Sequence, residues 1–109
     1  MNNIRINIYT SSLDSTKLLL NLDDNTVTLN NKKTKLNEYD IVSVINKILE
    51  ITKEWEKIEL INVNEYNKIE VLINFLDSKK EYFFKDKVPI NMYKIYTLIE
   101  DLQENQIWI

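Results

Sequence analysis

Apolar and polar residues alternate along the first part of the chain. Residues 4–9 alternate strictly, with isoleucine at every second position, which is the pattern of a strand buried on one face. Residues 17–22 and 26–30 form two further short runs, separated by the turn residues 23–25. Because Asp and Asn tolerate the left-handed backbone of tight turns, this spacing predicts a hairpin built without glycine.

From Asn37 onward the apolar residues recur every three or four positions, which predicts an amphipathic helix. Asn37 is placed to cap this helix by accepting a hydrogen bond from a free backbone N–H. Pro89 precedes a similar arrangement at Asn91, so we expect a second helix from there to about Glu104. The apolar stripe of the first helix consists of Ile41, Val44, Ile45, Ile48, Thr52 and Trp55.

Three further strands are expected between the two helices, over residues 57–63, 69–76 and 81–85, with a turn at 77–79. Residues 69–76 are apolar at successive positions, which indicates either a bulge or a strand buried on both faces. We favour the second interpretation. It predicts a central strand, with a helix or the C-terminal segment covering the second face of the sheet.

The two halves resemble each other at an offset of roughly 54 residues. Asn37, Tyr39, Ile41 and Ile45 then fall on Asn91, Tyr93, Ile95 and Ile99. The predicted fold is therefore α+β, with two tandem βββα repeats, approximately residues 1–55 and 56–109, that share one core in a single domain. The sheet is expected to be largely antiparallel, with both helices packed on it.

The composition excludes several kinds of chemistry. The chain has no Gly, so the glycine-rich loops that hold phosphates and dinucleotides are absent. It has no His or Cys either, which removes Ser-His-Asp and Cys-His catalysis and the usual zinc ligands. Asp23, Asp24 and Asp77 could serve as paired carboxylates, but a role in turns is the simpler interpretation. We expect no enzyme activity, no cofactor and no metal.

The sequence gives weaker evidence about the cellular location, the partners and the oligomeric state of the protein. The first residues alternate in polarity instead of forming an apolar leader, and no later run reaches membrane-spanning length, so a cytoplasmic protein without membrane contact is expected. The absence of Cys fits an intracellular compartment. A net charge of −3 does not by itself favour nucleic acid. The repeat is compatible with a monomer or a homodimer.

Two groups of charged residues are candidate binding sites. Lysines cluster near the third strand of each half, and the aromatic run 82–84 lies beside the second group. These residues could contact phosphates and stack on bases, although lysine also protects edge strands and the aromatic run fits a core. The lysines assigned to this nucleic-acid interpretation are Lys32, Lys33, Lys35, Lys85 and Lys87.

The second group is acidic and lies toward the C-terminus. Glu100, Asp101 and Glu104 occupy the end of the second helix, where the helix dipole disfavours negative charge. The apolar tail Ile107, Trp108 and Ile109 is expected either to pack back on the domain near Trp55 or to anchor a partner. Together these six residues are the predicted protein-binding surface.

The leading functional hypothesis is a non-catalytic protein-binding module. A small inhibitor or immunity-type protein of a phage or mobile element, for example an anti-defence protein, would act by occupying a protein surface. The alternative is a single-stranded nucleic-acid-binding protein that uses the lysines and aromatics near the third strand of each repeat. No motif identifies the partner.

Overall fold

The computed structural model describes residues 2–10, 15–62 and 66–105. In chain order its elements are β1 (Asn3–Thr10), β2 (Ser15–Asn21), β3 (Thr26–Leu29), β4 (Lys32–Lys35), α1 (Glu38–Lys53), the 3₁₀ turn η1 (Glu54–Glu56), β5 (Leu60–Asn62), β6 (Tyr66–Phe75), β7 (Ser78–Lys85), β8 (Lys87–Pro89) and α2 (Tyr93–Asn105).

Six strands form one antiparallel sheet in the order β4-β3-β2-β1-β6-β7. The first four strands follow one another as a meander, and β6 then pairs with the free edge of β1. Strands β5 and β8 pair with each other in a separate antiparallel ribbon. The predicted α+β class with a mostly antiparallel sheet and two helices is confirmed.

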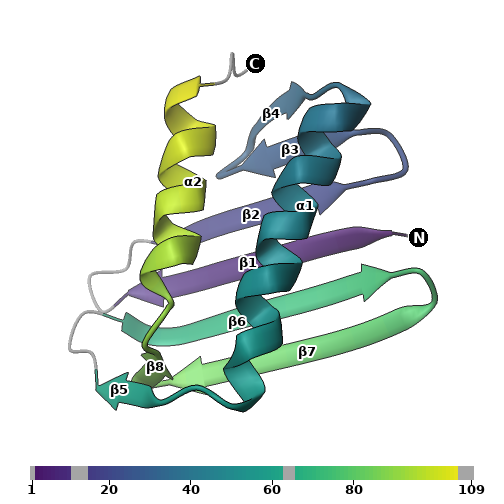
Figure 1. Ribbon diagram of the computed structural model, residues 1–109. Helices are drawn as coiled ribbons and strands as arrows, with labels where there is room; N and C mark the ends of the chain where they lie inside the picture. Colours follow the sequence, from purple (N-terminus) through teal and green to yellow (C-terminus); the bar gives the residue numbers. More distant parts are fainter. Residues whose placement is uncertain (1, 11–14, 63–65, 106–109) are drawn as a thin grey trace.

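Both helices lie across the same face of the sheet (Figure 1). The core fills the space between them and the sheet. Every second residue of β1 points into it, and Ile4 and Ile6 are completely buried. The helices contribute isoleucine and leucine at helical spacing, including Ile41 and Ile95. The alternation of period two in the strands and the stripe in the helices therefore meet as one apolar layer.

Helix α1 begins as its sequence predicts. Asn37 is the N-cap, and its side-chain oxygen accepts a hydrogen bond from the backbone N–H of Asp40 at 2.8 Å. The Asn37 amide also donates to the Asp40 carboxylate at 2.9 Å. None of the helices in the described ranges is long and apolar enough to cross a bilayer.

Asn91 does not repeat the role of Asn37. It is buried, and its side-chain oxygen accepts a hydrogen bond from Trp55 Nε1 at 2.8 Å. Its amide donates to the Ile51 carbonyl at 3.3 Å and to the Glu54 carboxylate at 3.0 Å. Asn91 therefore joins the end of α1 to the start of α2. The expectation that it caps α2 as Asn37 caps α1 is not met.

The aromatic run after β6 is divided between the two faces of the sheet. Tyr82 and Phe84 are half-buried and pack edge-to-face on Trp55, with ring centroids 5.1 and 5.2 Å away. Phe83 lies between them and is 60% exposed on the opposite face. The core interpretation is correct for two of the three rings, and Phe83 is free for contact.

Tight turns are built without glycine, as the sequence predicts. Asn25 in the β2–β3 turn has φ 59°, and the pair Asn30 and Asn31 between β3 and β4 has φ 50° and 72°. The β6–β7 turn consists of Leu76 and Asp77, with φ 50° and 61°, instead of the expected residues 77–79. Asn is the most tolerant non-glycine residue in this region, whereas Leu is unfavourable there.

Three sequence expectations need correction. Strands β4 and β8 were not expected, so each half contains four strands instead of three. No helix or strand of the described ranges covers the second face of the sheet (Figure 1), and residues 106–109, the other expected cover, lie outside those ranges. The halves also pair their strands differently, since β5 and β8 leave the main sheet. Common descent of the two halves stays a prediction.

Candidate functional site

The uncovered side of the six-stranded sheet is named the open face. It carries the strand positions that alternate with the buried ones, and cross-strand pairing arranges them in rows. One row consists of Lys33, Thr28, Leu19, Arg5, Leu72 and Glu81. The row on one side of it consists of Lys35, Thr26, Asn21, Asn3, Asn74 and Lys79. On the other side lie Lys17, Asn7, Glu70 and Phe83, and then Ser15, Tyr9, Lys68 and Lys85.

The open face is strongly basic. It holds two carboxylates, Glu70 and Glu81, against a larger set of cations. The excess is five positive charges, although the whole chain has a net charge of −3, so the remaining residues carry −8. The seven cations are Arg5, Lys17, Lys33, Lys35, Lys68, Lys79 and Lys85.

Both carboxylates of the open face are neutralised by lysines. Lys68 Nζ lies 3.3 Å from a Glu70 oxygen, and Lys79 Nζ lies 3.1 Å from a Glu81 oxygen. These are the two ion pairs found among the described residues, so the cations Arg5 and Lys17 have none there. The other five cations of the open face are exposed to solvent and are available to an anionic partner.

Repulsion between neighbouring cations adds to this field. Lys68 and Lys85 lie directly opposite each other on β6 and β7. Like charges at opposed positions destabilise a strand pair, whereas a bound anion would relieve the repulsion. The placement therefore favours a ligand that brings negative charge to the open face.

Aromatic rings lie among the cations. Tyr9 is half-buried on β1, and Lys68 Nζ lies 4.5 Å from the centroid of its ring. Phe83 projects from the edge strand β7 and is 60% exposed. A sheet surface that presents rings between lysines combines surfaces for base stacking with cations for phosphates.

An amide row crosses the central strands beside the cations. Asn21, Asn3 and Asn74 lie side by side on β2, β1 and β6. The Asn74 amide donates to the Asn3 side-chain oxygen at 3.3 Å. Asparagine side chains both donate and accept hydrogen bonds, and because Asn3 is buried, the half-buried Asn21 and Asn74 are the members of this row that can reach the edges of bases.

The structure brings together part of the lysine set predicted from the sequence. Lys33, Lys35 and Lys85 lie on the open face, with Lys79. Lys32 lies at a position of β4 that faces the opposite side of the sheet, and Lys87 lies in the β5–β8 ribbon. Neither residue therefore belongs to the open face. The correction follows from alternation, since neighbours in a strand point to opposite sides.

Arg5, Lys17 and Lys68 were missed as site residues. The alternation of residues 4–9 already placed Arg5 and Tyr9 on the side opposite the isoleucines. The alternation identifies these residues as site candidates only once the structure shows that no described helix or strand covers their side of the sheet. The alternation identifies the apolar side of β1 as the core side, but it does not show whether another element covers the polar side.

The predicted protein-binding surface is described in part. Glu100, Asp101 and Glu104 are exposed on α2. Residues 107–109 lie outside the described ranges, so the predicted position of the tail near Trp55 is not tested. The acidic residues are on the helix side of the molecule, away from the basic open face.

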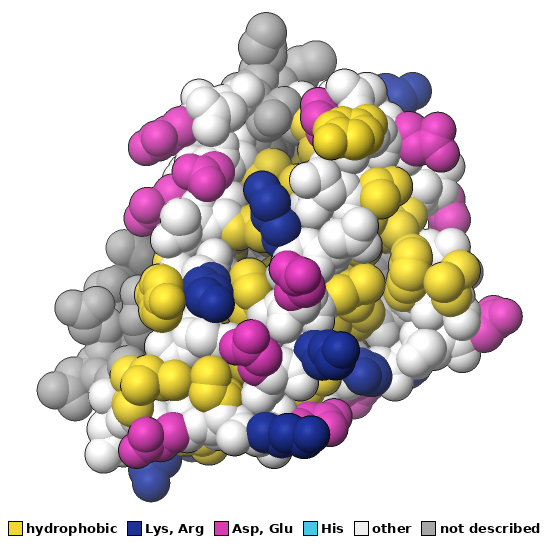
Figure 2. Space-filling model, viewed as in Figure 1, with side chains coloured by type: hydrophobic (Ala, Val, Ile, Leu, Met, Phe, Trp, Pro, Cys, Tyr) yellow, Lys and Arg dark blue, Asp and Glu magenta, His cyan; other side chains and the backbone are white. Residues whose placement is uncertain are grey.

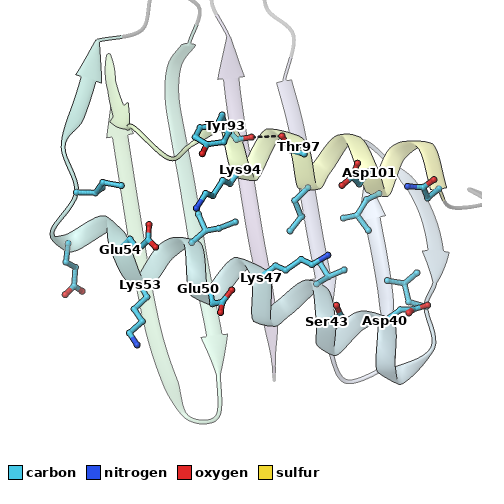
Figure 3. A pocket seen from close by; sticks show the side chains of 18 of the residues that line it. Asp40, Ser43, Lys47, Glu50, Lys53, Glu54, Tyr93, Lys94, Thr97 and Asp101 are labelled. Carbon is cyan, nitrogen blue, oxygen red and sulfur yellow. Dashed lines mark hydrogen bonds between the residues drawn. The ribbon is translucent and has the colours of Figure 1, made fainter.

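A groove of about 1380 Å³ runs between α1 and α2 on the helix side. Its apolar lining includes Val44, Ile51 and Leu98, and Lys47 and Lys94 reach into it from opposite helices (Figure 3). Acidic and basic side chains are interspersed around it (Figure 2). The groove therefore lacks the single sign of charge that distinguishes the open face.

The turn aspartates have structural roles. Asp24 accepts hydrogen bonds from the hydroxyl of Thr26 and from its backbone N–H, the latter at 3.2 Å. The hydroxyl bond is the main reason why the pKa of Asp24 lies below its ordinary value, and the charge of Lys33 adds to the effect. Over the described ranges, no group of three His, Cys, Asp or Glu residues is arranged to hold a metal ion.

No protein-family model matches the chain, and neither the curated proteins nor the solved structures contain a match.

Proposed function

We propose that the protein is a non-catalytic module that binds single-stranded nucleic acid on its open face. The observation that carries this proposal is the excess of five positive charges on that face of a chain with a net charge of −3. Such separation of charge orients the protein toward a polyanion and supplies the lysines that release counterions from phosphates.

A single strand is favoured over a duplex by the rings of Tyr9 and Phe83. Stacking on aromatic side chains requires bases that are not already stacked in a helix. Neighbouring strands lie about 4.8 Å apart, so the six-stranded sheet is roughly 24 Å wide. That width accommodates several nucleotides, in the range of about 4–16 that a single-strand-binding domain of similar size covers.

The proposal is tested by fluorescence anisotropy with a labelled oligothymidine of twelve nucleotides. Wild-type protein should bind it with an affinity that falls steeply with salt, because phosphate contacts release counterions. Combined substitution of Lys33→Gln, Lys35→Gln and Lys85→Gln should weaken binding about tenfold or more and lower the salt slope by roughly 2. Phe83→Ala should weaken binding by about 1–3 kcal/mol without changing that slope.

Matched controls lie on the helix side. Lys47→Gln, Lys53→Gln and Lys94→Gln remove the same charge from the groove region and should reduce affinity far less. A wild-type protein that fails to bind at low salt contradicts the proposal. Equal losses for both triple variants contradict the assignment to the open face. Preference for a duplex, or for vesicles containing anionic lipid, would show that a different polyanion is the ligand.

A second candidate is the protein-binding module expected from the sequence. Glu100, Asp101 and Glu104 are exposed on α2, and Asp101 borders the groove between the helices. This arrangement would suit a basic protein surface, as an inhibitor or immunity-type protein would require. Its test compares proteins recovered by immobilised wild type and by the variant Glu100→Gln/Asp101→Asn/Glu104→Gln. Loss of a bound protein only in that variant, with retention in the triple lysine variant, supports this candidate.

A further inference from the structure

Arg5 stands at the centre of the open face and differs from every other cation of the chain, since it is the only arginine. It lies on β1, which pairs with β2 on one side and β6 on the other. The cations at the edges of the face are all lysines. A single arginine at the centre therefore combines a unique side chain with a unique position.

The guanidinium of Arg5 is exposed and has no partner among the described residues. Neither of the ion pairs found there includes it. The carboxylate that the strand register places nearest is Glu70, diagonal to Arg5, and Glu70 is paired with Lys68 at 3.3 Å. The guanidinium, with its five N–H donors, is therefore accessible to a ligand from solvent.

The neighbours of Arg5 across the strands are apolar. Leu19 on β2 and Leu72 on β6 lie directly opposite it, and both are half-buried. Asn3 and Asn7 flank it along β1 on the same face. Such an environment supports the stem of the side chain and leaves its planar end free to meet a ligand with two acceptors.

We infer that Arg5 binds a pair of coplanar acceptors of the nucleic-acid strand through a bidentate contact, and so determines affinity by geometry in addition to charge. The inference rests on the proposed function and names a residue that fixes the strand at the centre of the face. Two groups of the ligand supply such acceptors: the oxygens of a phosphate, and O6 with N7 of guanine. Lysine offers a point charge and matches neither pair.

The decisive comparison is Arg5→Lys with Arg5→Gln. Arg5→Lys keeps the charge, so it should retain the wild-type salt slope while weakening binding about tenfold. Arg5→Gln should weaken binding at least as much and lower the salt slope by roughly 0.7, the value for one phosphate contact on a single strand. Lys17→Gln, a neighbouring cation of the same face, is the control for loss of one charge. Thermal unfolding checks that each variant is folded.

Two probes distinguish the acceptors, each used with the full-length protein. One is oligothymidine of twelve nucleotides, and the other carries a single central guanine. A loss in Arg5→Lys on both probes indicates a phosphate contact, whereas a loss confined to the guanine probe indicates the base edge. Either result supports the bidentate contact.

Failure of the Arg5 inference can be distinguished from failure of the proposed function. If Arg5→Lys binds both probes as wild type does, and Arg5→Gln loses no more than Lys17→Gln, Arg5 acts as a simple charge and the inference is wrong while the proposed function stands. If wild type binds neither probe at low salt, the proposed function fails and the role of Arg5 fails with it.

Discussion

Trp55 and Asn91 illustrate how single buried polar groups hold the two halves together. The indole N–H of Trp55 is satisfied by Asn91 at 2.8 Å, and the amide of Asn91 is satisfied in turn by the end of α1. A buried donor that loses its acceptor costs more free energy than an exposed one because water cannot replace the partner. This contact links residues far apart in the sequence.

Asn91→Ala should therefore lower the free energy of unfolding by about 2 kcal/mol. The substitution leaves Trp55 Nε1 without an acceptor and removes the connection to Ile51 and Glu54. Urea unfolding monitored by tryptophan fluorescence measures the change. Asn46→Ala is the matched control, since Asn46 is exposed on α1 and its loss should change stability by no more than about 0.5 kcal/mol. Equal effects of the two substitutions would contradict the role assigned to Asn91.

Asp24 provides a pH-dependent prediction. The Thr26 hydroxyl lowers the pKa of Asp24 in the folded protein, so the contact contributes stability above about pH 4 and loses it as the pH falls through the lower, folded-state pKa. Thr26→Val should raise the pKa of Asp24 toward its ordinary value. The backbone N–H of residue 26 and Lys33 remain, so the return should be incomplete.

The measurement for Asp24 is an NMR titration of its side-chain carboxyl carbon. Thr28→Val serves as control, because it makes the same change on β3 and leaves both hydrogen bonds to Asp24 intact. An unchanged titration midpoint in Thr26→Val would show that the hydroxyl does not control this carboxylate.

At the scale of elements, the β6–β7 turn is the least suitable sequence in the sheet. Leu76 has φ 50° and is 72% exposed, so it combines an unfavourable backbone with little burial. Two-residue turns with positive φ at both positions favour Asn-Gly. Leu76→Asn combined with Asp77→Gly should raise the free energy of unfolding by about 1 kcal/mol.

Urea unfolding also tests this turn. The control is Asp23→Gly in the β2–β3 turn, where φ of residue 23 is not positive and glycine should destabilise through the entropy of the unfolded chain. If the β6–β7 substitution lowers stability as Asp23→Gly does, the left-handed conformation of Leu76 is not a significant source of strain.

The elements also show what local sequence determines. Strand β1, the β2–β3 hairpin and α1 with its Asn37 cap were predictable, because each depends on periodicity and turn chemistry within a few residues. Strands β4 and β8 were not, since Lys32–Lys35 and Lys87–Pro89 are too short and too polar to show alternation. Asn91 matches Asn37 in sequence context, yet its partner Trp55 is reached only through tertiary structure.

Prediction of the candidate site from sequence was limited in the same way, because local patterns place single residues but not the pairing of distant strands. Three of the lysines singled out from the sequence lie on the open face, but their relation to Arg5 on β1 requires the strand order β4-β3-β2-β1-β6-β7. Apolar Leu72 favoured a covering element, whereas it lies half-buried beside Arg5 on the open face, which no described helix or strand covers. Long-range pairing, not local pattern, assembles the cationic rows.

At the scale of the whole molecule, charge of opposite sign is separated across the thin direction of the fold. The shortest principal extent is 20 Å, with the basic open face on one side and the exposed acidic residues Glu100, Asp101 and Glu104 on the other. The Debye length is about 30 Å at 0.01 M salt and about 8 Å at 0.15 M. The acidic side therefore influences a ligand on the open face only when salt is low.

Glu100→Gln/Asp101→Asn/Glu104→Gln should accordingly strengthen binding of oligothymidine roughly threefold at about 0.01 M salt and leave it unchanged at about 0.15 M. The physical reason is reduced long-range repulsion, since none of the three residues lies on the open face. Anisotropy titrations at both salt concentrations measure the effect, and Gln103→Ala on the same helix is an uncharged control. A gain that persists at 0.15 M would place these residues close to the bound strand, and the ligand would then have to cross the helix side instead of the sheet.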